Sequence, residues 1–171
     1  SLRGTSDETG VVSIESDVPG GLKRWSPDSP NLYDVRLSTN GNAVTDRIGF
    51  RTIGVDGSEI LINGKPVFLR GISLHEETLG EPPSMEFDDE SARALLSIAR
   101  DDLKANIVRL AHYPHAEVMT RLAEEMGLLV WSEIPVYWDV DFENPDTLAL
   151  TKRMQRENII RDRNRASIVF W

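Results

Sequence analysis

Apolar residues follow two different periodicities along the chain, and the change falls near Val67. Before that point, short apolar or alternating runs are separated by turn residues, a pattern typical of antiparallel strands. The candidate strands are Val11–Ile14, Leu32–Leu37, Ile48–Ile53 and Glu59–Ile62. The Asn63-Gly64 pair after the last of these runs is a strong signal for a tight hairpin. The first part of the chain is therefore predicted to consist of β-strands.

In the second part of the chain, stretches of helical periodicity take over. Residues 88–105 place apolar side chains three or four positions apart, and Asp88 suits the N-cap of the helix that this spacing predicts. A second apolar stripe begins at Met119 and stops at Gly127, a residue suited to the left-handed conformation that often ends a helix.

A third helix is predicted to begin at Asn144, because Pro145 suits the first helical position, and to end near Asn164. Apolar runs of strand length alternate with these helices. The first begins at Val67, and the others are Ile107–Ala111, Leu128–Trp131 and Ile168–Trp171. Because parallel strands need long crossover connections, the alternation predicts a parallel sheet covered by helices.

Ionisable and aromatic residues directly follow three of the predicted parallel strands. They are His75, Glu76 and Glu77 after the first strand, His112 and Tyr113 after the second, and Glu133, Tyr137 and Trp138 after the third. In parallel β/α folds, binding and catalytic groups gather at the carboxyl ends of the strands. We therefore expect a functional face here, the alternative being solvated loops without a chemical role.

These residues leave several interpretations open. Imidazole and carboxylate groups suit divalent cations, so His75, His112 and Glu133 are candidate metal ligands. Tyr137 and Trp138 combine an apolar face with a polar tip, which suits a sugar ring but equally suits covering the mouth of a barrel. His112 also has a purely structural interpretation, as a cap of the helix that follows.

Arginines in the second part of the chain are interpreted in two ways. Arg70 and Arg109 lie within predicted strands, where an unpaired charge is costly, so each is expected to face a carboxylate inside a barrel. Five arginines from Arg153 to Arg165 alternate with acidic residues around the third predicted helix. We interpret them as a solvated helix face rather than a basic binding patch.

Composition excludes several classes of function. The chain has no cysteine, which excludes disulfide frameworks, thiolate catalysis and iron–sulfur clusters. With 19 basic and 28 acidic residues, the formal net charge is −9, which disfavours nucleic acid and anionic membrane surfaces as partners. No apolar run approaches the roughly 18 residues of a membrane-spanning helix. The compartment stays undetermined, because absence of cysteine fits several.

Both ends of the chain are expected to be cuts within a longer protein. The first residue is Ser1 rather than Met, and residues 168–171 have the pattern of a buried strand with no turn or helix after it. An unfinished parallel sheet exposes its edges and its inner apolar face. We therefore expect the isolated chain to self-associate.

Several motifs, in the right order, resemble those of the family 2 glycoside hydrolases, which include β-galactosidases, β-glucuronidases and β-mannosidases. The resemblance extends from about residue 20 to the last residue. The motifs are Trp25–Tyr33 (WSPDSPNLY), Gly49–Thr52 (GFRT), Leu61–Gly71 (LINGKPVFLRG), Asn106–Arg109 (NIVR), His112–Pro114 (HYP), Gly127–Trp131 (GLLVW) and Arg161–Asn164 (RDRN).

The resemblance implies a retaining exo-β-glycosidase that uses two glutamates about 5–5.5 Å apart, one as acid/base and one as nucleophile. In the family pattern both glutamates lie beyond the tryptophan matched by Trp171, so no catalytic residue, metal or cofactor is expected within this chain. The resemblance also implies that His112 contacts the substrate sugar and that His75 and Glu133 line the site. Trp138 completes the expected substrate-binding residues as an aromatic platform.

The combined interpretation is a chain with parts of two domains and a combined β and α/β fold class. Residues 1–55 are expected to be the C-terminal strands of an immunoglobulin-like β-sandwich. Residues 56–171 are expected to be the first half of a (β/α)8 TIM barrel. The chain alone is then expected to be inactive.

The expected activity of the parent protein is hydrolysis of terminal β-galactosides, with a carbohydrate as its partner. β-Glucuronidase and β-mannosidase activities are alternatives, because Ser132 and Arg165-Ala166 depart from the family's usual Asp and His-Pro. Two alternatives belong to other classes. One is a metal-dependent barrel enzyme using His75, His112 and Glu133, and the other is a non-catalytic sugar-binding or scaffold module.

Overall fold

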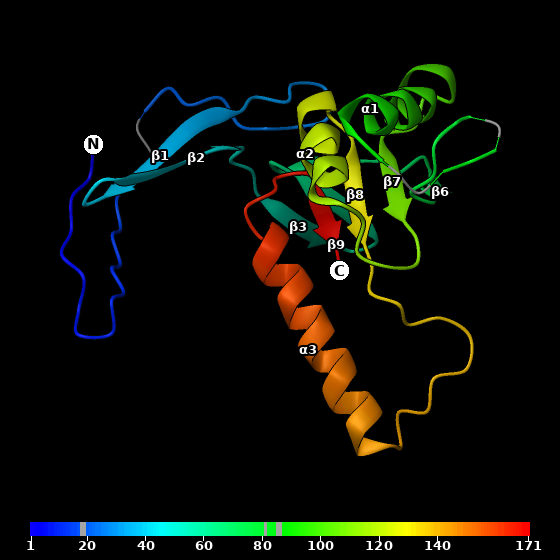
Figure 1. Ribbon diagram of the computed structural model, residues 1–171. Helices are drawn as coiled ribbons and strands as arrows, with labels where there is room; N and C mark the ends of the chain where they lie inside the picture. Colours follow the sequence, from blue (N-terminus) through cyan, green and yellow to red (C-terminus); the bar gives the residue numbers. More distant parts are fainter. Residues whose placement is uncertain (18–19, 81, 85–86) are drawn as a thin grey trace.

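The computed structural model describes residues 1–17, 20–80, 82–84 and 87–171, whose strands form three sheets (Figure 1). A hairpin is formed by β1 (Tyr33–Thr39) and β2 (Asn42–Ile48). A small antiparallel sheet contains β3 (Ile53–Asp56), β4 (Glu59–Ile62) and β5 (Lys65–Pro66). The third sheet is parallel, in the order β6 (Gly71–Leu74), β7 (Ile107–Leu110), β8 (Leu129–Ser132) and β9 (Ile168–Phe170).

Helices connect the parallel strands, which confirms the predicted mixed α/β fold. They are α1 (Asp89–Ser97) with its π-helical continuation η1 (Ile98–Asp102), α2 (Glu117–Met126) and α3 (Pro145–Asp162). The predicted N-caps are confirmed, because Asp88 accepts the Ser91 N–H at 2.8 Å and the Asn144 side chain caps α3. α1 and α2 lie side by side over the sheet, whereas most of α3 extends away from it (Figure 1). Within the described ranges, none of the helices combines the length and apolar character needed to cross a membrane.

The two faces of the parallel sheet carry different cores. The face covered by α1 and α2 contributes to the main core with Leu74, Val108, Leu110, Val130 and Ile168. On the opposite face, Ile107 and Leu129 belong to a smaller core with Trp25. Because side chains alternate along a strand, Arg109 and Trp131 project from this second face, two positions closer to the carboxyl ends than Ile107 and Leu129. The alternation therefore directs Arg109 toward the side of the sheet that a barrel would enclose.

Two predicted strands are corrected by the structure. Val11–Ile14 is irregular and exposed, because this apolar run has no partner strand among the described residues. Ile48–Ile53 is not one strand, since β2 ends and β3 begins at its two terminal residues. Between them, the Phe50 carbonyl accepts the Trp25 N–H at 2.8 Å, and a Cβ at Gly49 would lie 2.9 Å from the Trp25 Cβ. Close packing against Trp25 therefore replaces sheet pairing in this segment.

The first parallel strand begins later than the predicted start at Val67. The Val67 N–H donates to the Ile60 carbonyl at 2.9 Å, so Val67 extends the small antiparallel sheet instead. β6 begins at Gly71, where a Cβ would lie 2.4 Å from the Ile107 carbonyl oxygen. The absence of a side chain at Gly71 allows β6 and β7 to approach each other.

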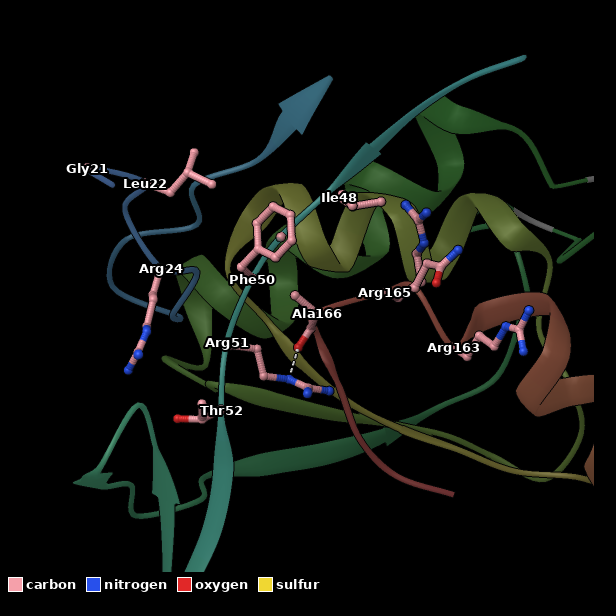
Figure 2. A pocket seen from close by; sticks show the side chains of 12 residues that line it. Gly21, Leu22, Arg24, Ile48, Phe50, Arg51, Thr52, Arg163, Arg165 and Ala166 are labelled. Atoms are coloured by element: carbon pink, nitrogen blue, oxygen red, sulfur yellow. Dashed lines mark hydrogen bonds between the residues drawn. The ribbon is translucent and has the colours of Figure 1, made fainter. Parts of the chain in front are cut away.

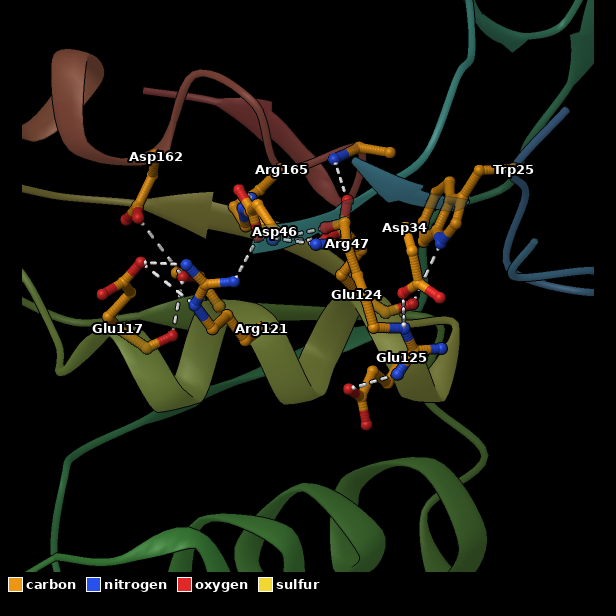
Figure 3. A network of polar contacts seen from close by, with 12 residues as sticks. Trp25, Asp34, Asp46, Arg47, Glu117, Arg121, Glu124, Glu125, Asp162 and Arg165 are labelled. Carbon is orange, nitrogen blue, oxygen red and sulfur yellow. Dashed lines mark hydrogen bonds and ion pairs between the residues drawn. The ribbon is translucent and has the colours of Figure 1, made fainter. Parts of the chain in front are cut away.

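A buried carboxylate joins the N-terminal segment to the start of β9 (Figure 3). The Glu124 side chain, on α2, is 1% exposed, accepts the Ala166 N–H, and accepts a hydrogen bond from Arg165 Nη1 at 3.0 Å. Arg165 also donates to Asp46 on β2, and Trp25 Nε1 donates to the Glu124 carbonyl at 2.9 Å. We call Glu124, Arg165 and Asp46 the junction cluster. Burial raises the pKa of Glu124, although Ala166 and Arg165 oppose this effect.

The junction cluster corrects the interpretation of the C-terminal arginines. Arg165 is buried and follows the end of α3, so it is not part of a solvated helix face. Arg153, within α3, is exposed and lies 3.8 Å from Glu157. Burial acts to raise the pKa of Asp46, but a hydrogen bond from Arg121 and the charge of Arg165 hold it below its ordinary value. Together with Arg121, which donates to Asp46, the cluster is a compensated set of charges rather than a site for an external anion.

The end of α2 also depends on a contact with the N-terminal segment. Gly127 has a φ of 76°, which confirms the predicted left-handed C-terminal position. A Cβ at this position would lie 2.3 Å from the Pro27 carbonyl oxygen. Gly127 is therefore required both by its backbone conformation and by the approach of Pro27.

We expect Gly127→Ala to lower the free energy of unfolding by more than about 2 kcal/mol, because left-handed strain of roughly 1–2 kcal/mol adds to the clash with Pro27. Gly57→Ala is the matched control, since Gly57 has a φ of 58° but nothing within 4 Å of its Cβ position. Urea unfolding of both variants measures the difference. Equal losses would contradict the role given to Pro27.

We expect Arg165→Met to lower the free energy of unfolding by about 3–5 kcal/mol, because it leaves the buried Glu124 carboxylate without its counter-charge. Adding Glu124→Gln to the same chain removes that charge and should restore at least half of the loss. Arg93→Met removes an exposed ion pair with Glu125 and should change stability by less than about 0.5 kcal/mol. Similar losses for the Arg93 and Arg165 variants, measured by urea unfolding, would disprove the importance of the buried pair.

Candidate functional site at the ends of the parallel strands

A charged pair lies at the carboxyl ends of β7 and β8. Arg109 belongs to β7, and Glu133 directly follows β8. Arg109 Nε donates to Glu133 Oε1 at 2.7 Å, and Nη2 donates to Oε2 at 3.1 Å. Two roughly parallel hydrogen bonds of this kind fix the guanidinium and the carboxylate relative to each other. Arg109 Nη1 also lies 3.5 Å from the Ser73 hydroxyl on β6, so three neighbouring strands meet here.

His112 is positioned by the same guanidinium. Its Nδ1 lies 3.1 Å from Arg109 Nη2 and 3.4 Å from Glu133 Oε2. Because a guanidinium nitrogen can only donate, His112 Nδ1 is the acceptor, and the neutral imidazole then carries its proton on Nε2. Among the bonds of the described residues none engages this Nε2–H, and the side chain is 34% exposed. The arrangement therefore offers an imidazole N–H donor to a bound molecule.

Aromatic rings extend outward from His112. The ring of His75 lies 5.6 Å from that of His112, edge to face, and the ring of Tyr137 lies 5.3 Å from it. Trp138 follows, perpendicular to Tyr137 at 5.7 Å and 95% exposed. Of the sequence candidates, His75, His112 and Glu133 are brought together, and Trp138 stands at the outer end of the ring series.

Glu76 and the third histidine lie in a layer behind these rings. Glu76 Oε2 accepts the Ala116 N–H at 2.6 Å, just before α2, and the Glu76 N–H donates to the Tyr113 hydroxyl at 3.0 Å. His115 is buried, stacks on Tyr113 at 4.8 Å, and donates from Nε2 to the Ala111 carbonyl at 3.0 Å. Burial lowers the pKa of His115. This layer supports the loop that carries His112.

The prediction of a carboxylate partner was made for Arg70 and Arg109, and it is confirmed for only one of them. Arg109 confirms the prediction of a carboxylate partner, because Glu133 binds it through both oxygens. The prediction is wrong for Arg70, which is exposed and precedes β6. Sequence reasoning did not include Arg109 and Ser73 among the site residues. The sequence does contain a signal for these two residues. Both lie near the ends of strands, and both alternate with the apolar residues that face the main core, so they project from the opposite face of the sheet.

A metal-ligand set is not formed by the candidate residues. Within the described ranges, no group of three or more His, Cys, Asp or Glu side chains could hold a metal ion. Although His112 lies near Glu133, both carboxylate oxygens accept from the Arg109 guanidinium. A positive group therefore already occupies the space beside the carboxylate.

A cavity of about 540 Å³ lies away from this cluster, next to the amino end of β9 (Figure 2). Its lining residues come from 21–24, 48–52 and 163–166. Within it, Arg51 Nε donates to the Ala166 carbonyl at 2.9 Å and Nη2 to the Ile168 carbonyl at 2.7 Å. Arg51 thus binds the backbone that leads into β9. Since sites of parallel β/α folds form at carboxyl ends, the Arg109–His112–Glu133 cluster is the better candidate.

Parallel strands in chain order with crossover helices, and a polar cluster at their carboxyl ends, define this chain as a β/α protein, the class that includes the β/α barrels. Residues 53–171 match the sequence model described as "Glycosyl hydrolases family 2, TIM barrel domain", and residues 3–51 match "Glycosyl hydrolases family 2". The chain therefore belongs to glycosyl hydrolase family 2.

Named relatives and solved structures agree with this membership. A β-galactosidase of Arthrobacter sp. (strain B7) is 33% identical over 171 residues, covering 94% of this chain and 16% of that protein. A β-glucuronidase of Streptococcus agalactiae is 30% identical, covering 86% of this chain and 27% of that protein. The structure of a family 2 β-galacturonidase from Eisenbergiella tayi bound to galacturonate superposes with a TM-score of 0.82 at 30% identity, covering 91% of this chain and 28% of that one. The chain thus spans less than a third of the length of these relatives.

We expect Arg109→Lys to lower the free energy of unfolding by about 1–2 kcal/mol, because an ammonium group cannot reproduce the two-pronged contact with Glu133 and still reach His112. NMR of the His112 ring should show its signals shifted in the same variant. Arg93→Lys, at an exposed ion pair with Glu125, is the control and should leave both measurements unchanged. Unaltered His112 signals in Arg109→Lys would refute the positioning role.

Proposed function

We propose that this chain is part of a retaining exo-β-glycosidase that hydrolyses terminal β-galactosides. In this proposal residues 1–55 are the end of an immunoglobulin-like β-sandwich, and residues 56–171 are the first half of the (β/α)8 barrel. The names of the relatives support a glycosidase, since they include β-galactosidases and β-glucuronidases. The hairpin β1–β2 supports the sandwich, and the order β6-β7-β8-β9 supports the first four strands of the barrel.

The observation that carries the proposal is the hydrogen bond between Arg109 and His112. It leaves the His112 Nε2–H free to donate to a hydroxyl of the terminal sugar. His75, whose ring contacts His112, supplies a second ionisable ring to the same wall. Trp138 provides an apolar face of the kind that packs on pyranose rings. His112, His75, Glu133 and Trp138 are therefore the proposed substrate-binding residues.

Glu133 is proposed to position other groups rather than to react. Both of its oxygens accept hydrogen bonds from the Arg109 guanidinium, so the carboxylate already has a partner within the chain. A retaining mechanism needs two carboxyl groups about 5–5.5 Å apart, one as acid/base and one as nucleophile. We propose that both belong to parts of the parent protein outside this chain, which spans less than a third of its relatives. The chain then contributes sugar recognition, and the rest of the barrel contributes the bond cleavage.

The charge of the cluster supports a neutral sugar. Arg109 is neutralised by Glu133, so the described residues of this cluster offer no uncompensated cation for the carboxylate of a glucuronide. The alternative, a β-glucuronidase, is favoured by the solved relatives that bind uronates, such as the Eisenbergiella tayi enzyme with galacturonate and the Ruminococcus gnavus enzyme with D-glucuronic acid. In that case a cation from the remainder of the parent protein would bind the carboxylate.

The test is an assay of the parent protein with nitrophenyl β-galactoside, β-glucuronide and β-mannoside. We expect turnover of the galactoside first, and about a 100-fold lower kcat/KM for His112→Ala, because one donor to the sugar is lost. Glu77→Ala is the control, since Glu77 is exposed and outside the cluster. The isolated 171-residue chain should give no turnover above a heat-inactivated sample. Turnover by the isolated chain would refute the assignment of both catalytic carboxylates to other parts, and inactivity of the parent on all three substrates would refute the proposed function.

A further inference from the structure

The loop after β8 displays its apolar residues instead of burying them. Ile134 is buried at the start of the loop, and Phe142, near its end, is 45% exposed. Between them, Tyr137 is 47% exposed and Trp138 is 95% exposed, more than any other large apolar side chain of the described residues. Trp138 also has a φ of 60°, a conformation that bulky residues rarely adopt. An exposed indole held in an unfavourable backbone conformation needs an explanation other than packing within this chain.

The ring of Trp138 is the outer end of a continuous series that starts at the candidate site. Neighbouring rings lie 5.6 Å apart from His75 to His112, 5.3 Å from His112 to Tyr137, and 5.7 Å from Tyr137 to Trp138. These separations are in the range at which aromatic rings touch. Arg109 binds His112 near the inner end of the series, and Trp138 at the outer end is exposed within this chain. A molecule held at His112 and extending outward would therefore pass over Tyr137 and Trp138.

We propose that Tyr137 and Trp138 form the binding surface for the aglycone, the group that leaves when the glycosidic bond is cleaved. This inference rests on the proposed function, in which His112 binds the terminal sugar. In an exo-acting enzyme the terminal sugar is enclosed and the rest of the substrate extends outward from it, so the aglycone would follow the ring series away from His112. Tyr137 and Trp138 are separate from the charged cluster and would bind the aglycone rather than the terminal sugar.

The chemistry of the surface selects an aglycone with a flat apolar face. Indole and phenol rings stack on aryl groups and on the apolar faces of pyranoses, and neither carries a charge. The same loop contains the exposed acidic residues Asp139, Asp141 and Glu143, which disfavour an anionic aglycone. The expected occupant is therefore a neutral ring, either an aryl group or a second sugar. Aryl glycosides and disaccharides distinguish these two sources.

The test compares aglycones in the parent protein while the terminal sugar stays the same. For Trp138→Ala we expect KM to rise about tenfold with nitrophenyl β-galactoside or with a β-linked galactosyl disaccharide, the effect of losing one stacking contact. With methyl β-galactoside, and for inhibition by free galactose, we expect no change, because neither molecule has a ring to place over Trp138. Trp138→Phe should recover most of the loss. A rise in KM for only one of the two ring-bearing substrates identifies whether the surface binds an aryl group or a second sugar.

Phe142→Ala is the matched control, because Phe142 is 45% exposed on the same loop but is not part of the ring series. It should leave every KM unchanged. Equal KM values for Trp138→Ala and the wild-type protein, or equal changes with methyl and nitrophenyl galactosides, would overturn the aglycone surface. So would a change of oligomeric state in Trp138→Ala, since it would mean that another protein surface covers the indole. If the wild-type parent hydrolyses none of the galactosides, the proposed function fails and the aglycone surface fails with it, an outcome distinct from the others.

Discussion

The buried carboxylate of Glu124 is the interaction on which the connection between the two parts of the chain depends. Its side chain binds the backbone at Ala166 and the guanidinium of Arg165, and its own carbonyl accepts the indole N–H of Trp25. Arg165 carries the connection on to Asp46 of the hairpin. A carboxylate away from water is costly unless it is paired and hydrogen-bonded, so these segments can occupy their positions only together. The paired carboxylate of Glu124 thereby fixes the backbone at Arg165 and Ala166, directly before β9.

The second ion pair, at the opposite end of the sheet, has a different character. Arg109 and Glu133 are less deeply buried than Arg165 and Glu124, and they leave neighbouring groups accessible. The first pair fixes the backbone that leads into a strand, while the second fixes the orientation of an imidazole where strands end. In a family 2 glycosyl hydrolase this separation has a clear advantage. The groups at the candidate site can change without disturbing the junction between the parts of the chain.

Local features of the fold could be predicted from the sequence, whereas long-range contacts could not. Asp88, Gly127 and Asn144 each act within a few residues, so their capping positions were readable from the sequence. The apolar run 48–53 reads as a strand, but its partner is the distant Trp25 rather than a neighbouring strand. At the candidate site, positions after strands predicted His75, His112 and Glu133, and the structure brings these side chains together, while their role in binding stays a prediction. The role of Arg109 depends on the register between β7 and β8, which brings residues 24 positions apart into contact.

Sequence distance within the junction cluster also has a consequence for how the protein is made. Asp46 and Arg165 are 119 residues apart. At a synthesis rate of about 5–20 residues per second, the ribosome adds Arg165 about 6–24 s after Asp46. During that interval the hairpin exists without the arginine that will bind Asp46, and for its last 41 residues, about 2–8 s, Glu124 is present without its counter-charge. Attachment of the N-terminal part is thus a late event in biogenesis, which waits for the chain to reach β9.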